Sequence, residues 1–223
     1  MREAFYLLIS GDSETWGIIG RSLRFSVFST IFSVLPGIPV GVALASREFR
    51  GRRALSAVIN ALTAMPTVVV GLFVYSLISR SGPLGNFNFL YAPAGIIMGQ
   101  ALLAFPIVAS LSYAGLSKLD PRFRETLITL GAGRFSRLTA TVREAKTLLV
   151  VAIVTAFGRV TGEVGVCMML GGNIRFVTRT MTTAIALDTS KGEFERAMSL
   201  GVVLLCIALA INLAIHALAP REN

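Results

Sequence analysis

The chain has little of what most enzymes need for catalysis. One histidine and two cysteines occur among 223 residues, which leaves little room for a metal site or a catalytic triad. No Gly-x4-Gly-Lys-Ser/Thr loop is present, so the chain cannot hydrolyse ATP by that route. Cys167 and Cys206 both lie inside apolar runs, and we interpret them as packing residues. We therefore expect no catalytic residue, no metal site and no cofactor bound by this chain.

Charge is scarce as well, and it is unevenly distributed. Only 15% of the residues are charged and 54% are hydrophobic, with a mean hydropathy of +0.72, which is too apolar for an ordinary soluble domain. The net charge of +9 could suggest a nucleic-acid partner. The basic residues, however, flank apolar segments and form no stripe, a pattern that indicates membrane topology. We expect a lipid bilayer as partner and no nucleic acid.

Five apolar segments are long enough to cross the hydrocarbon layer as helices, which takes about 20 residues each. The chain is therefore predicted to be an all-α polytopic membrane protein with about five transmembrane helices. Residues 1–20 are amphipathic enough to lie at the membrane surface, residues 21–219 form one transmembrane domain, and 220–223 form a cytoplasmic tail. The five predicted spans are residues 25–46, 54–79, 93–113, 147–170 and 197–219.

The loops between these segments predict the orientation. Residues 47–53 carry four arginines against one acid, and residues 118–146 carry seven basic residues against three acids. Loops rich in lysine and arginine stay in the cytoplasm. We therefore expect both loops to be cytoplasmic in a cell-membrane protein, with the N-terminus outside and the C-terminus in the cytoplasm.

The second basic loop has the pattern of two short helices joined at glycine. Asp120-Pro121 is typical of a helix start, with aspartate as the cap and proline in the first turn. Gly131-Ala132-Gly133 then ends this helix, and a second one follows. A rigid helix–Gly–helix unit on the cytoplasmic side suits a subunit that is driven by a separate motor. The candidate coupling residues are Asp120, Arg122, Glu125, Gly131, Ala132 and Arg134.

Two charges interrupt the fourth segment. Arg159 and Glu163 are four residues apart, so they can pair on a helix, and ionisable groups at membrane depth are functional candidates by default. A structural ion pair and a role in a pore are equally compatible with the sequence. Thr155 and Thr161 lie beside them and complete our candidates for a translocation path.

The loop that follows this segment holds a third set of candidates. Arg175, Thr178 and Arg179 could steer an oxyanion or dock a delivering protein. They could equally anchor the chain at the outer membrane interface, which is the interpretation we favour.

The glutamate followed six residues later by glycine, 125–131, resembles the cytoplasmic motif of transmembrane subunits of type I ATP-binding-cassette importers. Both alanines that follow the glutamate in that motif are replaced here, by Thr126 and Leu127, and the family's later Leu-Pro pair is absent. The resemblance covers nearly the whole chain. It implies a five-helix permease that works as a homodimer, with two copies of an ATPase subunit that bind ATP–Mg and an extracytoplasmic binding protein.

Three further stretches narrow the resemblance. Residues 171–194, the sequence Ser-Gly-Pro-Leu-Gly at 81–85, and Arg-Glu-Ala at 143–145 look like the corresponding parts of tungstate-importer permeases. The likeness implies a tetrahedral oxyanion as cargo, tungstate first, with molybdate, sulfate or phosphate as alternatives. A small intramembrane enzyme using Glu163 and Asp188, or a channel gated by the basic loop, remains a competing class. Neither explains the helix–Gly–helix loop.

Overall fold

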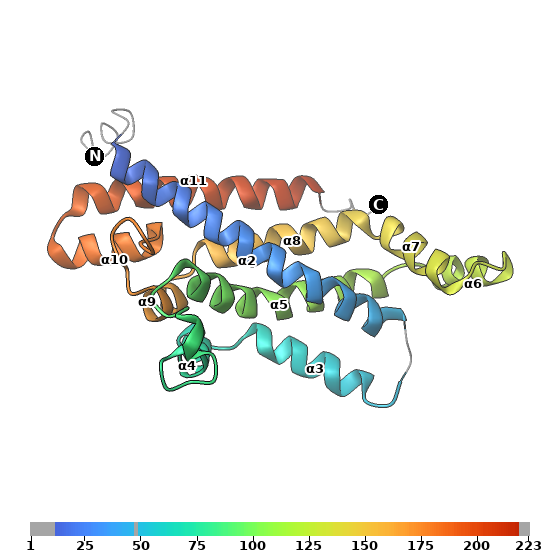
Figure 1. Cartoon of the computed structure of the whole chain (residues 1–223). Helices are drawn as coiled ribbons and strands as arrows, with labels where there is room; N and C mark the ends of the chain where they lie inside the picture. The colour runs from blue at the N-terminus through green and yellow to red at the C-terminus, as the bar shows by residue number, and fades with distance from the viewer. Residues whose placement is uncertain (1–11, 47–48, 219–223) are drawn as a thin grey trace.

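The computed structural model describes residues 12–46 and 49–218, and within them every regular element is a helix. The prediction of an all-α chain is confirmed. Most of the helices lie along one long axis (Figure 1). Three of them are long and apolar enough to cross a membrane unbroken: α2 (Ser13–Ser46), α5 (Pro93–Ser117) and α11 (Phe194–Leu218).

The remaining two predicted spans are bent pairs of helices. Helices α3 (Arg52–Thr63) and α4 (Thr67–Ile78) meet at 100° around Pro66. The predicted span over residues 54–79 is therefore a bent pair of helices and not a single straight one. Proline has no N–H to donate and disfavours a helical residue before it, so α3 ends just before Pro66 and α4 starts just after it.

The fourth predicted span is bent as well. Helix α8 (Lys146–Thr161) and helix α9 (Gly165–Gly171) meet at 62°. The break covers residues 162–164, so it separates Arg159, in the last turn of α8, from Glu163, which lies in the break itself. If each bent pair counts as one span, the described part of the chain has five.

The N-terminal boundary also differs from the prediction. Residues 1–11 lie outside the described residues, but α2 already begins at Ser13 and runs through residue 20 without a break. Asp12 starts the helix by accepting hydrogen bonds from the Thr15 amide at 2.9 Å and the Thr15 hydroxyl at 2.6 Å. Ile18 and Ile19 are buried against residues of α10 and α11. Residues 13–20 thus belong to the helix bundle, because their apolar face is covered by protein.

Helix α2 packs closely along α5. A Cβ on Gly41 would lie 2.6 Å from the Ser112 Cβ and 2.8 Å from the Ala109 carbonyl oxygen. No other side chain fits at that distance, so this glycine sets how near the two helices approach. Small residues at helix contacts are typical of membrane bundles, where close packing replaces the hydrophobic effect.

A buried glutamine joins four helices at the centre of the bundle. The Gln100 side chain on α5 accepts a hydrogen bond from Ser29 of α2 at 2.9 Å. Its amide nitrogen donates to the Val160 carbonyl of α8 at 3.1 Å and to the Cys167 sulfur of α9 at 3.2 Å. Every polar atom of this side chain has a partner, so a polar residue can be buried here without the cost of an unmade bond.

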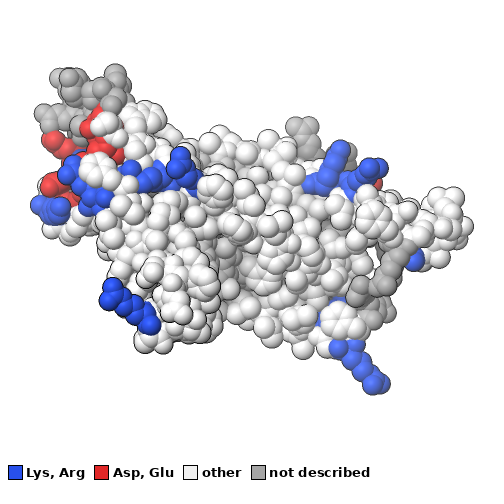
Figure 2. Space-filling view, in the orientation of Figure 1, with Lys and Arg blue, Asp and Glu red and all other residues white. Residues whose placement is uncertain are grey.

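The bundle has two polar ends separated by an apolar belt. One end, the α10 end, holds the start of α2, the 3₁₀ helix η1 (Gly85–Phe87), α9 and α10 (Met181–Lys191), and the opposite α6 end holds α6 (Pro121–Thr129) and α7 (Arg134–Glu144). Charged side chains gather at both ends in Figure 2, and the surface between them is almost free of charge. This distribution is the one expected of a protein that spans a bilayer.

Candidate functional site

The predicted coupling element is a pair of helices that projects from the α6 end (Figure 1). Asp120 caps α6, with its Oδ1 accepting a hydrogen bond from the Arg122 amide at 2.9 Å, and Pro121 occupies the first turn. Both features agree with the sequence prediction. Arg122 is exposed. The side chains of Glu125 and Arg134 lie outside the described residues.

The turn between the two helices depends on glycine. Gly131 has φ +68°, the left-handed conformation that side chains disfavour. Its amide donates to the Ile128 carbonyl, and the Ala132 amide donates to the Leu127 carbonyl, both at 3.0 Å. Nothing lies within 4 Å of the place a Cβ on Gly131 would take. A side chain here would therefore meet backbone strain alone, without a clash.

The exposed apolar side chains on this element were not predicted from the sequence. Leu130 is 76% exposed and Phe135 is 81% exposed, on either side of the glycine turn. Ile128 and Leu138 are exposed too. Large apolar side chains exposed on a projecting polar loop make this element a candidate protein-binding surface. Leucine and phenylalanine on either side of a predicted helix break could have indicated this exposed apolar surface.

The two charges of the fourth span form the ion pair that their spacing suggested. Arg159 Nη1 donates to Glu163 Oε2 at 2.8 Å. The Arg159 side chain is 40% exposed, whereas that of Glu163 is 4% exposed. Glu163 lies beyond the end of α8, in the break, and its Oε1 accepts a hydrogen bond from the Val166 amide of α9 at 3.3 Å. The carboxylate therefore stabilises the arginine and the start of the next helix together.

The neighbouring threonines do not offer free hydroxyl groups. Thr155 donates to the Val151 carbonyl at 2.8 Å, and Thr161 donates to the Phe157 carbonyl at 2.7 Å. Thr161 also lines an apolar groove between α8 and α11, beside Gly158 of α8, Gly162 just after it, and several leucine and isoleucine residues of α11. These contacts are more typical of a face that packs against another helix than of a water-filled translocation path.

A row of polar side chains on α3 was not singled out from the sequence. Ser56, Asn60 and Thr63 follow one another at spacings of four and three residues, so they share one face of the helix. Asn60 and Thr63 are exposed, and Ser110 of α5 donates a hydrogen bond to the Asn60 side-chain oxygen. Polar side chains exposed along a membrane helix need water or another protein surface beside them. The spacing was the signal that could have identified them.

The outer-loop candidates have different roles in the structure. Thr178 is fully buried, accepts a hydrogen bond from the Ile174 amide at 2.9 Å and donates to the Gly171 carbonyl at 2.5 Å. Both hydrogen bonds of the Thr178 hydroxyl go to the backbone of its own loop, and the side chain is not accessible to an anion.

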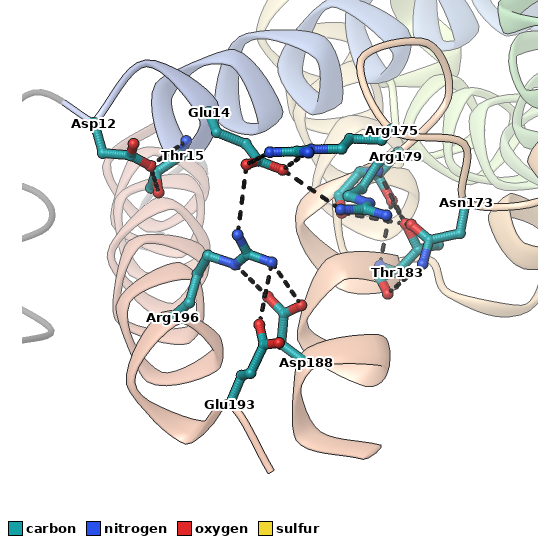
Figure 3. A network of polar contacts seen from close by, with 11 residues as sticks. Asp12, Glu14, Thr15, Asn173, Arg175, Arg179, Thr183, Asp188, Glu193 and Arg196 are labelled. Atoms are coloured by element: carbon teal, nitrogen blue, oxygen red, sulfur yellow. Dashed lines mark hydrogen bonds and ion pairs between the residues drawn. The ribbon is translucent and has the colours of Figure 1, made fainter. Parts of the chain in front are cut away.

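The two arginines of this loop point toward a glutamate at the start of α2 (Figure 3). Arg175 donates to Glu14 through Nε at 2.9 Å and Nη2 at 2.5 Å, and Arg179 Nη1 lies 3.5 Å from Glu14. The hydrogen bonds to Glu14 raise the pKa of Arg175. The sequence analysis did not pair these residues because they are separated by more than 150 positions.

A second ion pair holds α10 to α11. Arg196 donates to Asp188 through Nε at 2.8 Å and Nη2 at 3.0 Å, and its Nη1 lies 3.6 Å from Glu14 (Figure 3). Asp188 is fully buried. A bidentate pair of this kind is geometrically specific. Both carboxylates of the competing enzyme hypothesis, Asp188 and Glu163, are thus bound to arginines. No cluster of three potential ligands within the described ranges could hold a metal ion.

Comparison with known proteins places the chain among transport proteins. The family described as "Binding-protein-dependent transport system inner membrane component" matches residues 37–222. The chain is 39% identical to the tungstate uptake system permease protein TupB of Peptoclostridium acidaminophilum, over 97% of this chain and 95% of that protein. It is 35% identical to TupB of Campylobacter jejuni, over 97% and 91%. It is 30% identical to the molybdenum transport system permease protein ModB of Escherichia coli K12, over 96% and 95%.

The fold has matches among solved structures. A chain of the bacterial alginate ABC transporter, solved in complex with an alginate-bound periplasmic protein, superposes with a TM-score of 0.75. The match covers 94% of this chain and 80% of that one at 19% sequence identity, so it concerns the fold alone. The family match over residues 37–222 and the 39% identical relative show that this chain belongs to the inner membrane components of binding-protein-dependent transport systems, as a type I ATP-binding-cassette importer permease.

Proposed function

We propose that the chain is the permease subunit of an ATP-driven importer that carries tungstate. The observation that carries the coupling part of this proposal is the α6–α7 element. It is a helix–Gly–helix unit at the end of the molecule (Figure 1), and its Leu130 and Phe135 are exposed. The choice of tungstate rests on the names of the two TupB relatives, which are more similar to this chain than the molybdenum permease is. Molybdate, sulfate and phosphate are the alternatives.

Two ATPase subunits would supply the energy in this proposal. They would bind the ATP–Mg and receive the α6–α7 element in a cleft, since its apolar side chains are left uncovered in the single chain. Asp120 and Gly131 would fix the shape of the element, and Arg122, Glu125, Ala132 and Arg134 would surround the contact. Closure of the ATPases would then move the membrane helices as rigid bodies between inward-open and outward-open states.

A homodimer would enclose the path. The polar row on α3 includes Asn60 and Thr63, which are exposed on the single chain, and a second copy related by two-fold symmetry would cover the row. Hydroxyl and amide groups bind an oxyanion loosely, which suits a path that must release its cargo. Arg159 and Glu163 stay candidates for this path, together with their two neighbouring threonines, although the structure favours a stabilising role for the pair.

The orientation is part of the proposal. The α6 end would face the cytoplasm, because both strongly basic loops lie there, and the α10 end would face a binding protein that delivers the anion. Single cysteines in a variant without the two native ones test this with an impermeant thiol reagent. Positions Asn86 and Lys191 should react in intact cells, whereas Arg52 and Arg134 should react only after lysis. Reaction at Arg134 from outside would reverse the orientation.

The competing classes can be separated by one experiment. The permease would be co-expressed with its ATPase subunit and purified, and ATP hydrolysis would be measured with and without the anion-loaded binding protein. The proposal predicts a stable complex whose hydrolysis rises with the loaded binding protein. Chemical turnover by the isolated chain would instead support the enzyme class, and anion flux without ATP would support a channel. Either result would overturn the proposal.

A further inference from the structure

Four arginines meet around one glutamate at the α10 end. Glu14 is within 3.6 Å of a guanidinium nitrogen of Arg175, Arg179 and Arg196 (Figure 3). The fourth is Arg21, two turns further along α2 on the same face as Glu14. Its Nη1 lies 3.2 Å from the place a Cβ on Gly17 would take, so the guanidinium group lies back along the helix toward Glu14. It interacts through space with Glu14 and with Arg179.

The acids of this cluster pair with its arginines unequally, and Arg196 takes most of them, including Glu193 at 3.4 Å. Arg196 is neutralised by its bidentate pair with Asp188. Arg175 donates two hydrogen bonds to Glu14, at 2.9 and 2.5 Å, one to each carboxylate oxygen. Arg179 reaches the same carboxylate only at 3.5 Å. Arg179 therefore shares Glu14 with Arg175, and no ion pair involves Arg21 among the residues the structure describes.

These two arginines also hold buried donors without a hydrogen-bond partner. Nε and Nη2 of Arg21 and Nε of Arg179 are inaccessible to solvent and unbonded within the described part of the chain. Arg179 as a whole is only 9% exposed. A buried polar group that lacks its hydrogen bond costs about 1–3 kcal/mol, and more if it is charged. Unmade donors on two neighbouring cations call for an anionic acceptor.

We propose that Arg21 and Arg179 form a binding site for a phosphate-like tetrahedral oxyanion at the α10 end. Guanidinium groups present several N–H donors in a plane and match the oxygens of such an anion. Two such groups from separate elements, α2 and the loop before α10, hold the anion between them. Arg175 is not part of the site, because its Nε and Nη2 already donate to both oxygens of Glu14.

The same chemistry is available from two sources. Arg21 lies two turns into α2 from the charged end, about 10 Å along the helix from Glu14, which is a depth where lipid phosphates can reach it. A free oxyanion in solution offers the same tetrahedral oxygens. The inference does not rest on transport, so it stands or falls separately from the proposed function.

The test uses the purified complex with its ATPase subunit and compares Arg21→Gln with Arg24→Gln. Arg24 lies on the same helix and is exposed, so it controls for the loss of one positive charge. Thermal unfolding would be followed with increasing tungstate or inorganic phosphate, against chloride at equal ionic strength. Native mass spectrometry of the same samples would record retained phospholipid. A third variant, Arg21→Lys, keeps the charge and removes the planar fork.

A free-anion site predicts a rise in the unfolding midpoint with tungstate or phosphate in the parent and in Arg24→Gln. The apparent affinity should be weaker by about tenfold or more in Arg21→Gln, with Arg21→Lys in between. A lipid-phosphate site predicts a phospholipid that the parent and Arg24→Gln retain and that Arg21→Gln loses. Without anion or lipid, Arg21→Gln should melt no lower than Arg24→Gln, because it removes two buried donor atoms that have no hydrogen-bond partner. The proposal would be overturned if Arg21→Gln melted below Arg24→Gln without anion or lipid. It would also be overturned if these two variants did not differ in either the anion titration or the retained phospholipid.

Discussion

The pair of Arg159 and Glu163 gives the sharpest prediction, because its two members are buried to different extents. Glu163 is 4% exposed and Arg159 is 40% exposed. Arg159→Gln leaves a carboxylate inside the bundle with one remaining side-chain hydrogen bond, from the Val166 amide at 3.3 Å. Glu163→Gln leaves an arginine whose long side chain can carry its charge toward a polar surface. The first variant should therefore be the less stable of the two.

The structure sets the size of the difference. Removing one partner of a buried pair costs about 3–5 kcal/mol when the other charge stays buried. Removing the acid from a partly exposed arginine costs about 1 kcal/mol. The double variant Arg159→Gln/Glu163→Gln removes both charges, so it should recover most of the stability that Arg159→Gln loses. For a chain of this size, 1 kcal/mol corresponds to roughly 2–4 °C in the unfolding midpoint.

Thermal unfolding of detergent-purified variants, followed by size-exclusion chromatography of the folded fraction, measures this ranking. Arg24→Gln is the matched control, since Arg24 is exposed and no ion pair involves it among the described residues. Stability should fall in the order Arg24→Gln, Glu163→Gln, Arg159→Gln, with the double variant above Arg159→Gln. If Glu163→Gln were the least stable, or if the double variant were no better than Arg159→Gln, the stabilising role would be refuted. Normal stability with altered uptake in Glu163→Gln would instead assign the glutamate to the path.

Three further outcomes are expected. Gly131→Val should insert normally yet lose coupled transport or ATPase assembly, because φ +68° strains a β-branched residue. The control Gly133→Ala, at φ −63°, should behave like the parent. Normal uptake by Gly131→Val would contradict the prediction. Leu130→Ser should reduce co-purification of the ATPase without lowering the stability of the permease, since Leu130 is 76% exposed. Unchanged co-purification would show that the ATPase does not bind at Leu130. Hydrogen bonds from Thr15 hold the pKa of Asp12 below its ordinary 3.8, so the cap stabilises above that pH and is lost as pH falls through the lower folded pKa. Asp12→Asn should therefore narrow its stability gap to the parent as pH drops from about 5 to 3, and a constant gap would refute the cap.

The features predicted correctly from the sequence are those set by neighbouring residues. Asp120 and Pro121 start α6 as their types suggest, and Gly131 has the left-handed conformation that the break between two helices required. Arg159 and Glu163 pair because four positions separate them. Each of these depends on a few residues of local chain, so sequence alone carries the information.

Proline showed the limit of such local reasoning. Pro66 separates two helices at 100°, whereas Pro36 and Pro39 lie inside the continuous α2 and Pro106 inside α5. Within a membrane bundle, neighbouring helices can compensate for the hydrogen bond that proline removes. Whether a given proline ends a helix thus depends on tertiary packing, which the order of residues does not reveal.

The long-range contacts at the α10 end could not be predicted either, because they too depend on tertiary packing. Glu14 and Arg175 are 161 positions apart, and Ser22 of α2 accepts a hydrogen bond from the Met181 amide across a similar separation. Nothing in the local pattern of either segment indicates its partner. The polar row on α3 was different: its spacing was visible, and only the exposure of Asn60 in the folded chain distinguished it from an ordinary packed face.

Uptake by the reconstituted transporter tests the central claim most directly. The permease would be placed in proteoliposomes with its ATPase subunit and binding protein, and labelled tungstate would be offered with and without ATP. The account predicts ATP-dependent accumulation of tungstate that an excess of unlabelled tungstate abolishes and that equal amounts of molybdate, sulfate or phosphate reduce less. Accumulation that does not depend on ATP, or a complex that carries sulfate or phosphate in preference to tungstate, would contradict it.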